Sequence, residues 1–198
     1  MMTPPVTELV LSLFPGVGLL DMAFEAAGFC VVRAPDLIHG GDIRSWRAPP
    51  AGRFDGIIAR PPCQGFSCAN RERMDANHPS VVMSRSLLQL TADIIAGCEP
   101  TWALIENVPT VPDVCVSGFR HQRIAINDWE CGGSQLRWRA IQWLDRAGNH
   151  LRPVRVNDRA ENCRKGRRPE AITTKPISSR QTYVDQCRKQ GLPCALEL

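Results

Sequence analysis

The chain has 198 residues, 43% of them hydrophobic, and its 24 Lys and Arg against 20 Asp and Glu give a formal net charge of +4. This length suits one α/β domain that buries roughly 70% of its unfolded surface. The sequence has no secretory h-region and no apolar run of about 18 residues, so we expect neither a leader nor a membrane span. We therefore expect a cytoplasmic protein.

The nine cysteines do not form a pattern typical of a disulfide framework or a metal site. Their number is odd, none is spaced Cys-x-x-Cys, and the four histidines do not cluster with them. Free thiols in this number are typical of a reducing compartment. We therefore expect no metal.

Apolar runs and helical spacings alternate in the first half of the chain. Strands are expected near residues 8–14, 29–33, 54–60 and 102–106, and helices near 19–27 and 84–97. This alternation predicts an α/β fold with a mostly parallel sheet. Beyond it, short extended runs are expected at 119–126, 138–144 and 151–156, and residues 157–176 are polar and basic.

The first predicted strand ends in a glycine turn, Phe14-Pro15-Gly16-Val17-Gly18, ahead of a helix. Glycines at such a turn let a ligand approach the backbone closely. Asp21 replaces the third glycine of the dinucleotide fingerprint, which argues against a nicotinamide site. An ordinary tight turn is the alternative.

Cys63 follows an apolar strand run and two prolines, in the segment Arg60-Pro61-Pro62-Cys63-Gln64. The prolines end the strand and stiffen the turn. The thiol is thus expected at the carboxyl end of a strand, where ligands bind in open α/β sheets. A small buried apolar role is the alternative, because free cysteines are commonly buried.

Two further segments carry polar groups that could act at the same edge. Glu106 ends an apolar strand and could donate a proton, or could be a solvated carboxylate. Gln135, Arg137 and Arg139 alternate on an extended segment and would share one face, which suits phosphate or base contacts. The polar face of an exposed strand is the alternative for these three.

Together these motifs resemble the DNA (cytosine-5)-methyltransferase family of phage or bacterial type. The matching segments occur in the family's order and are Phe14-x-Gly16-x-Gly18, Pro62-Cys63-Gln64, Glu106-Asn107-Val108 and Gln135-x-Arg137-x-Arg139. Gly41-Asp42-Ile43 resembles the segment that contacts the adenine, and Asp36 is a candidate for the ribose-binding acid. Residues 180–193 resemble the motif that follows the target-recognition region.

The resemblance implies a Rossmann-like, S-adenosylmethionine-dependent fold and methylation of cytosine C5 in double-stranded DNA, through a covalent Cys63 adduct on a flipped base. It implies catalytic roles for Cys63, Glu106, Arg137 and Arg139. The cofactor, S-adenosyl-L-methionine, would be bound by Phe14, Gly16, Gly18, Leu19, Asp36, Asp42, Ile43 and Pro62. DNA would be contacted by Gln64, Ser67, Gln135, Arg137 and Arg139.

The chain also departs from the family pattern. Ser12 stands where an acid is usual, and Arg60 stands where a small residue is usual. The family's final glycine-asparagine motif, which leads into a helix beside the first strand, has no counterpart. We therefore expect an exposed apolar surface near residues 9–14. A separate chain could supply the missing motif.

Charge is distributed unevenly. Residues 1–136 hold 10 Lys and Arg and 14 Asp and Glu, a net of −4, whereas residues 137–198 hold 14 and 6, a net of +8. We predict a catalytic domain over residues 1–145, and a short basic segment over 146–198 that resembles a target-recognition region and partly returns to the catalytic domain. A basic tail suits a polyanion such as DNA, although a solvated tail is the alternative.

Two functions therefore remain open. The first is a small DNA cytosine methyltransferase. The second is a truncated or degenerate relative that binds DNA or a partner without catalysis. A nicotinamide-dependent oxidoreductase is disfavoured by the Pro-Cys-Gln turn and the incomplete glycine fingerprint.

Overall fold

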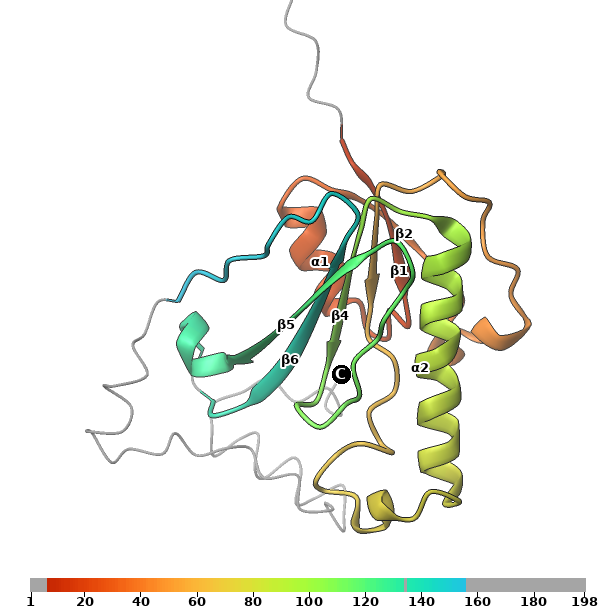
Figure 1. The fold of residues 1–198 in the computed structure, drawn as a ribbon, viewed down its shortest axis with the longest axis vertical. Helices are drawn as coiled ribbons and strands as arrows, with labels where there is room; N and C mark the ends of the chain where they lie inside the picture. The colour runs from red at the N-terminus through yellow and green to blue at the C-terminus, as the bar shows by residue number, and fades with distance from the viewer. Residues whose placement is uncertain (1–6, 134, 156–198) are drawn as a thin grey trace, which may run out of the picture.

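The computed structural model describes residues 7–133 and 135–155. A six-stranded sheet has the order β2-β1-β3-β4-β6-β5. Its strands are β1 (Leu9–Leu13), β2 (Cys30–Arg33), β3 (Gly56–Ala59), β4 (Trp102–Asn107), β5 (Arg120–Asn127) and β6 (Trp138–Asp145). The two α-helices are α1 (Leu19–Ala26) and α2 (Pro79–Cys98), and both are visible in Figure 1.

The sheet is mixed, and its parallel part comes first in the chain. Strand β1 pairs in parallel with both β2 and β3, and β3 pairs in parallel with β4. Strand β6 then inserts antiparallel between β4 and β5. The predicted α/β class with a mostly parallel sheet is confirmed.

Helices cover both faces of the sheet, so its central strands are mostly apolar on both sides. On one face, Val10 and Ile58 pack with the α1 residue Phe24. On the other face, Leu11 and Ile57 belong to a cluster that includes several α2 residues. Side chains alternate along a strand, so neighbouring residues of β1 reach opposite helices (Figure 1).

Three predictions from the sequence need correction. Helix α2 begins at Pro79 rather than at residue 84, because the His78 side chain accepts a hydrogen bond from the Ser80 N–H at 3.3 Å, and proline suits the first helical position. Residues 151–155 form no strand. The expected exposure near residues 9–14 is wrong for β1, since Val10 is 0% and Leu11 1% exposed.

Several predictions fall outside the described residues. They are the basic stretch at 157–176, the motif over residues 180–193, and any structure of Cys163, Cys187 and Cys194. The six cysteines that the structure describes are all free thiols.

Helix α2 is the one described helix whose length and composition would allow it to cross a membrane. Its position instead is that of a core helix, because Leu88, Ile94 and Ile95 are buried in the same cluster as the sheet residues. The apolar surface of α2 is therefore explained by packing.

Shortening a core residue of α2 should reveal this packing. Ile95→Ala removes a side chain with 0% exposure and should lower the free energy of unfolding by about 2–5 kcal/mol. Val82→Ala on the same helix is the control, because Val82 is 51% exposed and its loss should change stability by less than about 0.5 kcal/mol. Urea unfolding measures both, and equal losses would contradict the assigned faces.

Candidate active site

The site is built where three parallel strands end side by side. Leu13 of β1 pairs with Ala59 of β3, and Ala59 pairs with Ile105 of β4. The residues that follow these three therefore emerge at one edge of the sheet. Strand β6 runs the other way, so the residues at its amino end, next to Asn107, meet the same edge.

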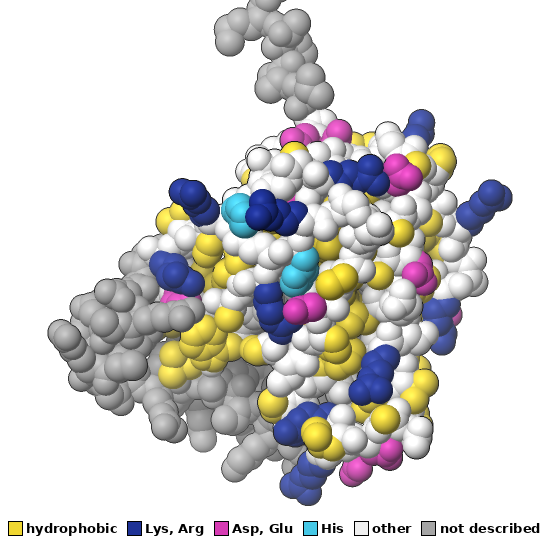
Figure 2. All heavy atoms as spheres, in the orientation of Figure 1, with side chains coloured by type: hydrophobic (Ala, Val, Ile, Leu, Met, Phe, Trp, Pro, Cys, Tyr) yellow, Lys and Arg dark blue, Asp and Glu magenta, His cyan; other side chains and the backbone are white. Residues whose placement is uncertain are grey.

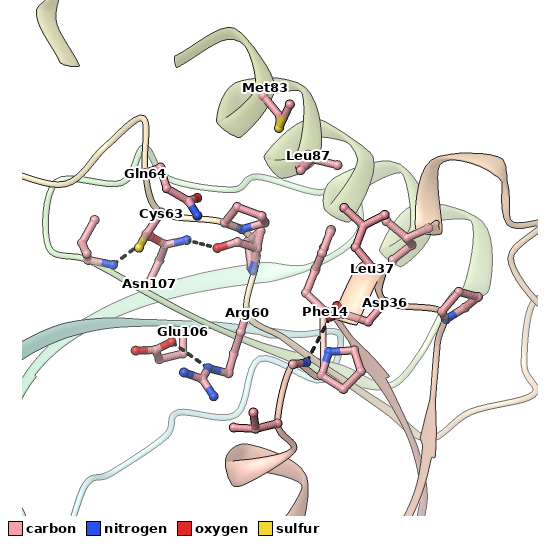
Figure 3. Close-up of a pocket in the computed structure, with 18 of the residues that line it drawn as sticks. Phe14, Asp36, Leu37, Arg60, Cys63, Gln64, Met83, Leu87, Glu106 and Asn107 are labelled. Carbon is pink, nitrogen blue, oxygen red and sulfur yellow. Dashed lines mark hydrogen bonds and ion pairs between the residues drawn. The ribbon is translucent and has the colours of Figure 1, made fainter. Parts of the chain in front are cut away.

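The turn that carries Cys63 is fixed on both sides. The Asn107 side-chain amide donates a buried hydrogen bond to the Pro61 carbonyl at 2.9 Å. The Cys63 carbonyl accepts from the N–H groups of Phe66 and Ser67, each at 2.9 Å. Cys63 itself is half-buried, and Figure 3 shows it beside Asn107 at the cavity.

Gly65 lets this turn dock against α2. Its N–H donates to the Ser84 hydroxyl at 2.9 Å, a buried contact. A Cβ on Gly65 would lie 2.7 Å from both the Ser80 carbonyl oxygen and the Val81 Cα, closer than van der Waals contact allows. The absence of a side chain here therefore sets how the turn approaches the helix.

The glycine turn after β1 forms the next wall. Phe14 (φ 55°) and Gly16 (φ 54°) have left-handed backbones, which only glycine adopts without strain. The Asp36 carboxylate accepts hydrogen bonds from the Gly16 N–H at 3.0 Å and the Ile38 N–H at 2.9 Å. Asp36 thus ties the turn after β1 to the segment that follows β2.

Asp42 and Ile43 form a third wall. The Asp42 carboxylate accepts from the backbone and the guanidinium of Arg44, and this bonding holds the pKa of the Asp42 carboxyl below its usual value. Ile43 is buried beside it, with 6% exposure. The pair therefore presents an apolar surface next to fixed polar groups.

Glu106 lies between two arginines. The Arg60 Nε is 3.2 Å from one carboxylate oxygen and the Arg139 Nε is 2.7 Å from the other. The Glu106 side chain is 18% exposed, so both ion pairs are partly shielded from water. Figure 3 shows the Arg60 side chain reaching from the Cys63 turn to Glu106.

A further guanidinium, that of Arg137, lies in the same charged group. Burial lowers the pKa of Arg137, and the charges of Arg139 and Arg60 lower it further, whereas Glu106 and Asp128 oppose this shift. Three cations and one carboxylate thus share this end of the site, which favours an anionic ligand.

These walls enclose a cavity of about 390 Å³. The predicted site residues that line it are Phe14, Gly16, Asp36, Asp42, Ile43, Pro62, Cys63, Gln64, Glu106, Arg137 and Arg139. Four predicted residues do not line it, and these are Gly18, Leu19, Ser67 and Gln135. The structure thus brings together residues spread over more than half of the chain.

The local structure around each of these four residues accounts for its position outside the cavity. Gly18 caps α1 in a left-handed conformation, and Leu19, at 63% exposure, begins that helix on its outer side. The Ser67 hydroxyl accepts from the Ala69 N–H. Gln135 precedes β6, which begins at Trp138, and its N–H donates to the Asp128 carboxylate.

The sequence prediction missed several wall residues. Asn107 holds the Cys63 turn, and its amide beside Glu106 at a strand end was the available signal. Leu87 reaches the cavity from the buried face of α2, and Leu37 and Met83 line it as well. No local motif marks these apolar residues, because the tertiary packing of α2 and the segment after β2 brings them here.

The part of the chain that holds this cysteine and carboxylate matches known proteins. Residues 37–114 match the family model of C-5 cytosine-specific DNA methylases. The type II methyltransferase M.FnuDI of Fusobacterium nucleatum is 32% identical over 114 aligned positions, and the match covers 50% of this chain and 32% of that protein. The resemblance to this family is therefore confirmed, with Cys63 and Glu106 inside the matched range.

Two solved structures are similar in fold. The Entamoeba histolytica methyltransferase EhMeth gives a TM-score of 0.54 at 17% identity, over 77% of this chain and 57% of that chain. A protein named as a DNA modification methyltransferase of an E. coli prophage gives 0.50 at 23% identity, over 70% and 47%. The chain thus spans about a third of M.FnuDI and about half of each solved structure. These likenesses support the Rossmann-like methyltransferase fold.

Adding a methyl group at Gly65 should disturb the Cys63 turn. Gly65→Ala should lower the free energy of unfolding by about 1–3 kcal/mol, because the new Cβ would overlap Ser80 and Val81. Gly97→Ala on α2 is the matched control; a Cβ there meets nothing within 4 Å, so it should raise stability by roughly 0.5–1 kcal/mol. Denaturant unfolding gives both values, and a neutral Gly65→Ala would show that the turn is not closely docked.

Proposed function

We propose that this chain methylates cytosine C5 in double-stranded DNA, with Cys63 as the covalent nucleophile. The observation that carries the proposal is the shared cavity of the half-buried Cys63 thiol and the arginine-bound Glu106 carboxylate. The match to the family model supports DNA cytosine methylation in general. The covalent route is our inference from the residues.

The cavity residues suit S-adenosyl-L-methionine. The Asp36 carboxylate provides acceptors for ribose hydroxyls, and the buried Ile43 provides an apolar surface for the adenine. The backbone of Gly16 carries no Cβ that could obstruct a ligand. Phe14 and Pro62 complete this end of the cavity. When bound, the cofactor would supply an electrophilic methyl group.

Cys63 would act by adding to C6 of the flipped base. Addition converts the ring to an enamine whose C5 is nucleophilic, which divides one difficult step into easier ones. The thiolate is the reactive form of the side chain. Release of Cys63 after loss of the C5 proton would return the enzyme to its starting state.

Glu106 would hold the ring at N3 while this adduct exists, through a proton that lies between the carboxyl group and N3, because both atoms are otherwise acceptors. Its neighbours Arg137 and Arg139 would hold the flipped nucleotide and its phosphates through charge-assisted hydrogen bonds. Extruding the base costs a few kcal/mol, which such contacts can offset. Glu106 and the two arginines thus belong to one recognition surface.

Binding of the DNA backbone is proposed to depend mainly on the basic second part of the chain. On the face shown in Figure 2, the described basic side chains are separated by acidic, apolar and uncharged groups rather than joined in a stripe. Residues 137–198 carry the +8 excess. Long-range attraction to phosphates would therefore come from that part.

We also propose that a separate chain supplies the family's final motif and packs against the exposed apolar side chains near α1. Val17 lies just before α1 and Leu19 and Met22 lie near its start, and the three are 70%, 63% and 59% exposed. Such exposed apolar side chains would suit a partner segment. Cofactor-dependent activity that appears only when this segment is added would support the partner; activity of the chain alone would make it unnecessary.

The primary test is transfer of a labelled methyl group from S-adenosyl-L-methionine to duplex DNA. The chain should place label in 5-methylcytosine, and Cys63→Ser should reduce the rate at least about a thousandfold, because a hydroxyl is a poor nucleophile here. The serine variant should still bind DNA. Label at an undiminished rate from Cys63→Ser would remove the covalent route, and no label from the folded chain would favour binding without catalysis.

Removing the Arg137 guanidinium should weaken DNA binding and reduce the salt dependence of that binding. Arg137→Ala should lower affinity and reduce the slope of log affinity against log salt by about one, since each phosphate contact releases roughly one counterion. Arg53→Ala is the control, because Arg53 is exposed and precedes β3, away from the cavity edge. A slope unchanged in Arg137→Ala would argue against a phosphate contact.

A further inference from the structure

Both oxygens of the Glu106 carboxylate are engaged in this structure. Arg60 binds one oxygen at 3.2 Å and Arg139 binds the other at 2.7 Å. The carboxylate can contact a base in the cavity only through an oxygen that faces that base. Each oxygen can accept a second hydrogen bond, so a base that contacts Glu106 either shares an oxygen with an arginine or displaces that arginine.

Contacts around the two arginines decide which one yields. Arg139 belongs to β6, its contact is the shorter, and its Nη1 also donates to the Trp138 carbonyl at 2.8 Å. Arg60 follows the end of β3, and among residues 7–133 and 135–155 Glu106 is its one ion-pair partner. The Arg60 side chain is also more exposed, at 31% against 25%.

The position of Arg60 links this contact to the nucleophile. Its backbone N–H pairs with the Leu13 carbonyl at 3.2 Å, so its main chain is fixed to β1. Its long side chain has several rotatable bonds beyond this fixed main chain, and Arg60 stands three residues before Cys63. A movement of the guanidinium thus opens the space over Glu106 without moving the thiol turn.

We propose that Arg60 is a latch: it holds Glu106 until a cytosine enters, and the cytosine then displaces the Arg60 guanidinium from Glu106 while Arg139 stays in place. Arg60 is then a positioning residue that acts on the base through Glu106. This inference rests on the proposed function, because it takes cytosine as the base. It predicts that part of the binding free energy of cytosine is used to break the Arg60–Glu106 pair.

The test compares how tightly the protein binds two single-stranded DNA oligonucleotides. No cofactor is added, so no methyl transfer takes place. One strand is oligo(dC), whose bases need no unpairing, and the other is an abasic strand of the same length. Fluorescence anisotropy gives both affinities, and their ratio measures the preference for the base. Loss of a positive charge weakens phosphate attraction equally for both strands, so this effect cancels in the ratio.

Arg60→Met removes the charge and keeps the length, so it should raise the ratio roughly two- to fivefold, the range expected for a partly exposed ion pair. Arg60→Lys keeps an ion-pair partner and should leave the ratio close to that of the unaltered chain. Arg60→Gln provides a second uncharged variant if Arg60→Met does not fold. Arg53→Met is the matched control for charge loss and should not change the ratio.

A double-mutant cycle tests whether Arg60 acts through Glu106. In the Glu106→Gln background the carboxylate is gone, so Arg60→Met should no longer raise the ratio. An unchanged or lower ratio in Arg60→Met overturns the latch, as does an equal rise in both backgrounds.

These outcomes separate the latch from the proposed function. A raised ratio that depends on Glu106 supports the latch even if the chain transfers no methyl group. Methyl transfer by the chain together with an unchanged ratio in Arg60→Met overturns the latch and leaves the proposed function in place.

Discussion

The parallel pairing of β1, β3 and β4 is the constraint on which the site depends. Because Leu13, Ala59 and Ile105 are in register on three neighbouring strands, the glycine turn, the Cys63 turn and Glu106 begin side by side at one edge of the sheet. No long loop is needed to bring them together. The antiparallel β6 then adds Arg139 from the other direction. A backbone hydrogen-bond pattern thus sets the distances between the polar groups.

The same arrangement of strands places arginines beside the Glu106 carboxylate. Glu106 has 18% exposure, and a lone carboxylate so placed would lose much of its hydration. Arg60 and Arg139 replace that hydration with one contact to each oxygen. The surplus of cations, with Arg137 beside them, leaves the cavity suited to a partner that brings negative charge.

Local sequence signals predicted the elements well where a periodic pattern was strong. The six strands and two helices lie close to the expected ranges, because short apolar runs and glycine or proline stops mark them. The Pro-Cys-Gln turn and Glu106 could be assigned to one edge because parallel strands share it. The cap formed by His78 was not anticipated, so the start of α2 was placed too late.

Features that depend on side chains distant in sequence were not predictable in this way. Sequence comparison marked Arg60 as unusual, yet only the folded chain pairs it with Glu106, 46 positions later. Gln135 matched a motif, but its main chain belongs to the turn before β6. The sequence also predicts an exposed apolar surface near β1, whereas the structure buries this strand. Helices α1 and α2 cover its two faces, and this covering is a tertiary property that no local pattern shows.

The pairings that build the site all join residues far apart in the chain. Residues of β1 and β3, and of β3 and β4, pair across 46 positions, and β4 pairs with β6 across 33 to 43 positions. Pairings of such long sequence separation slow the search for the native state. The residues of the site therefore come together only when the long-range part of the sheet forms.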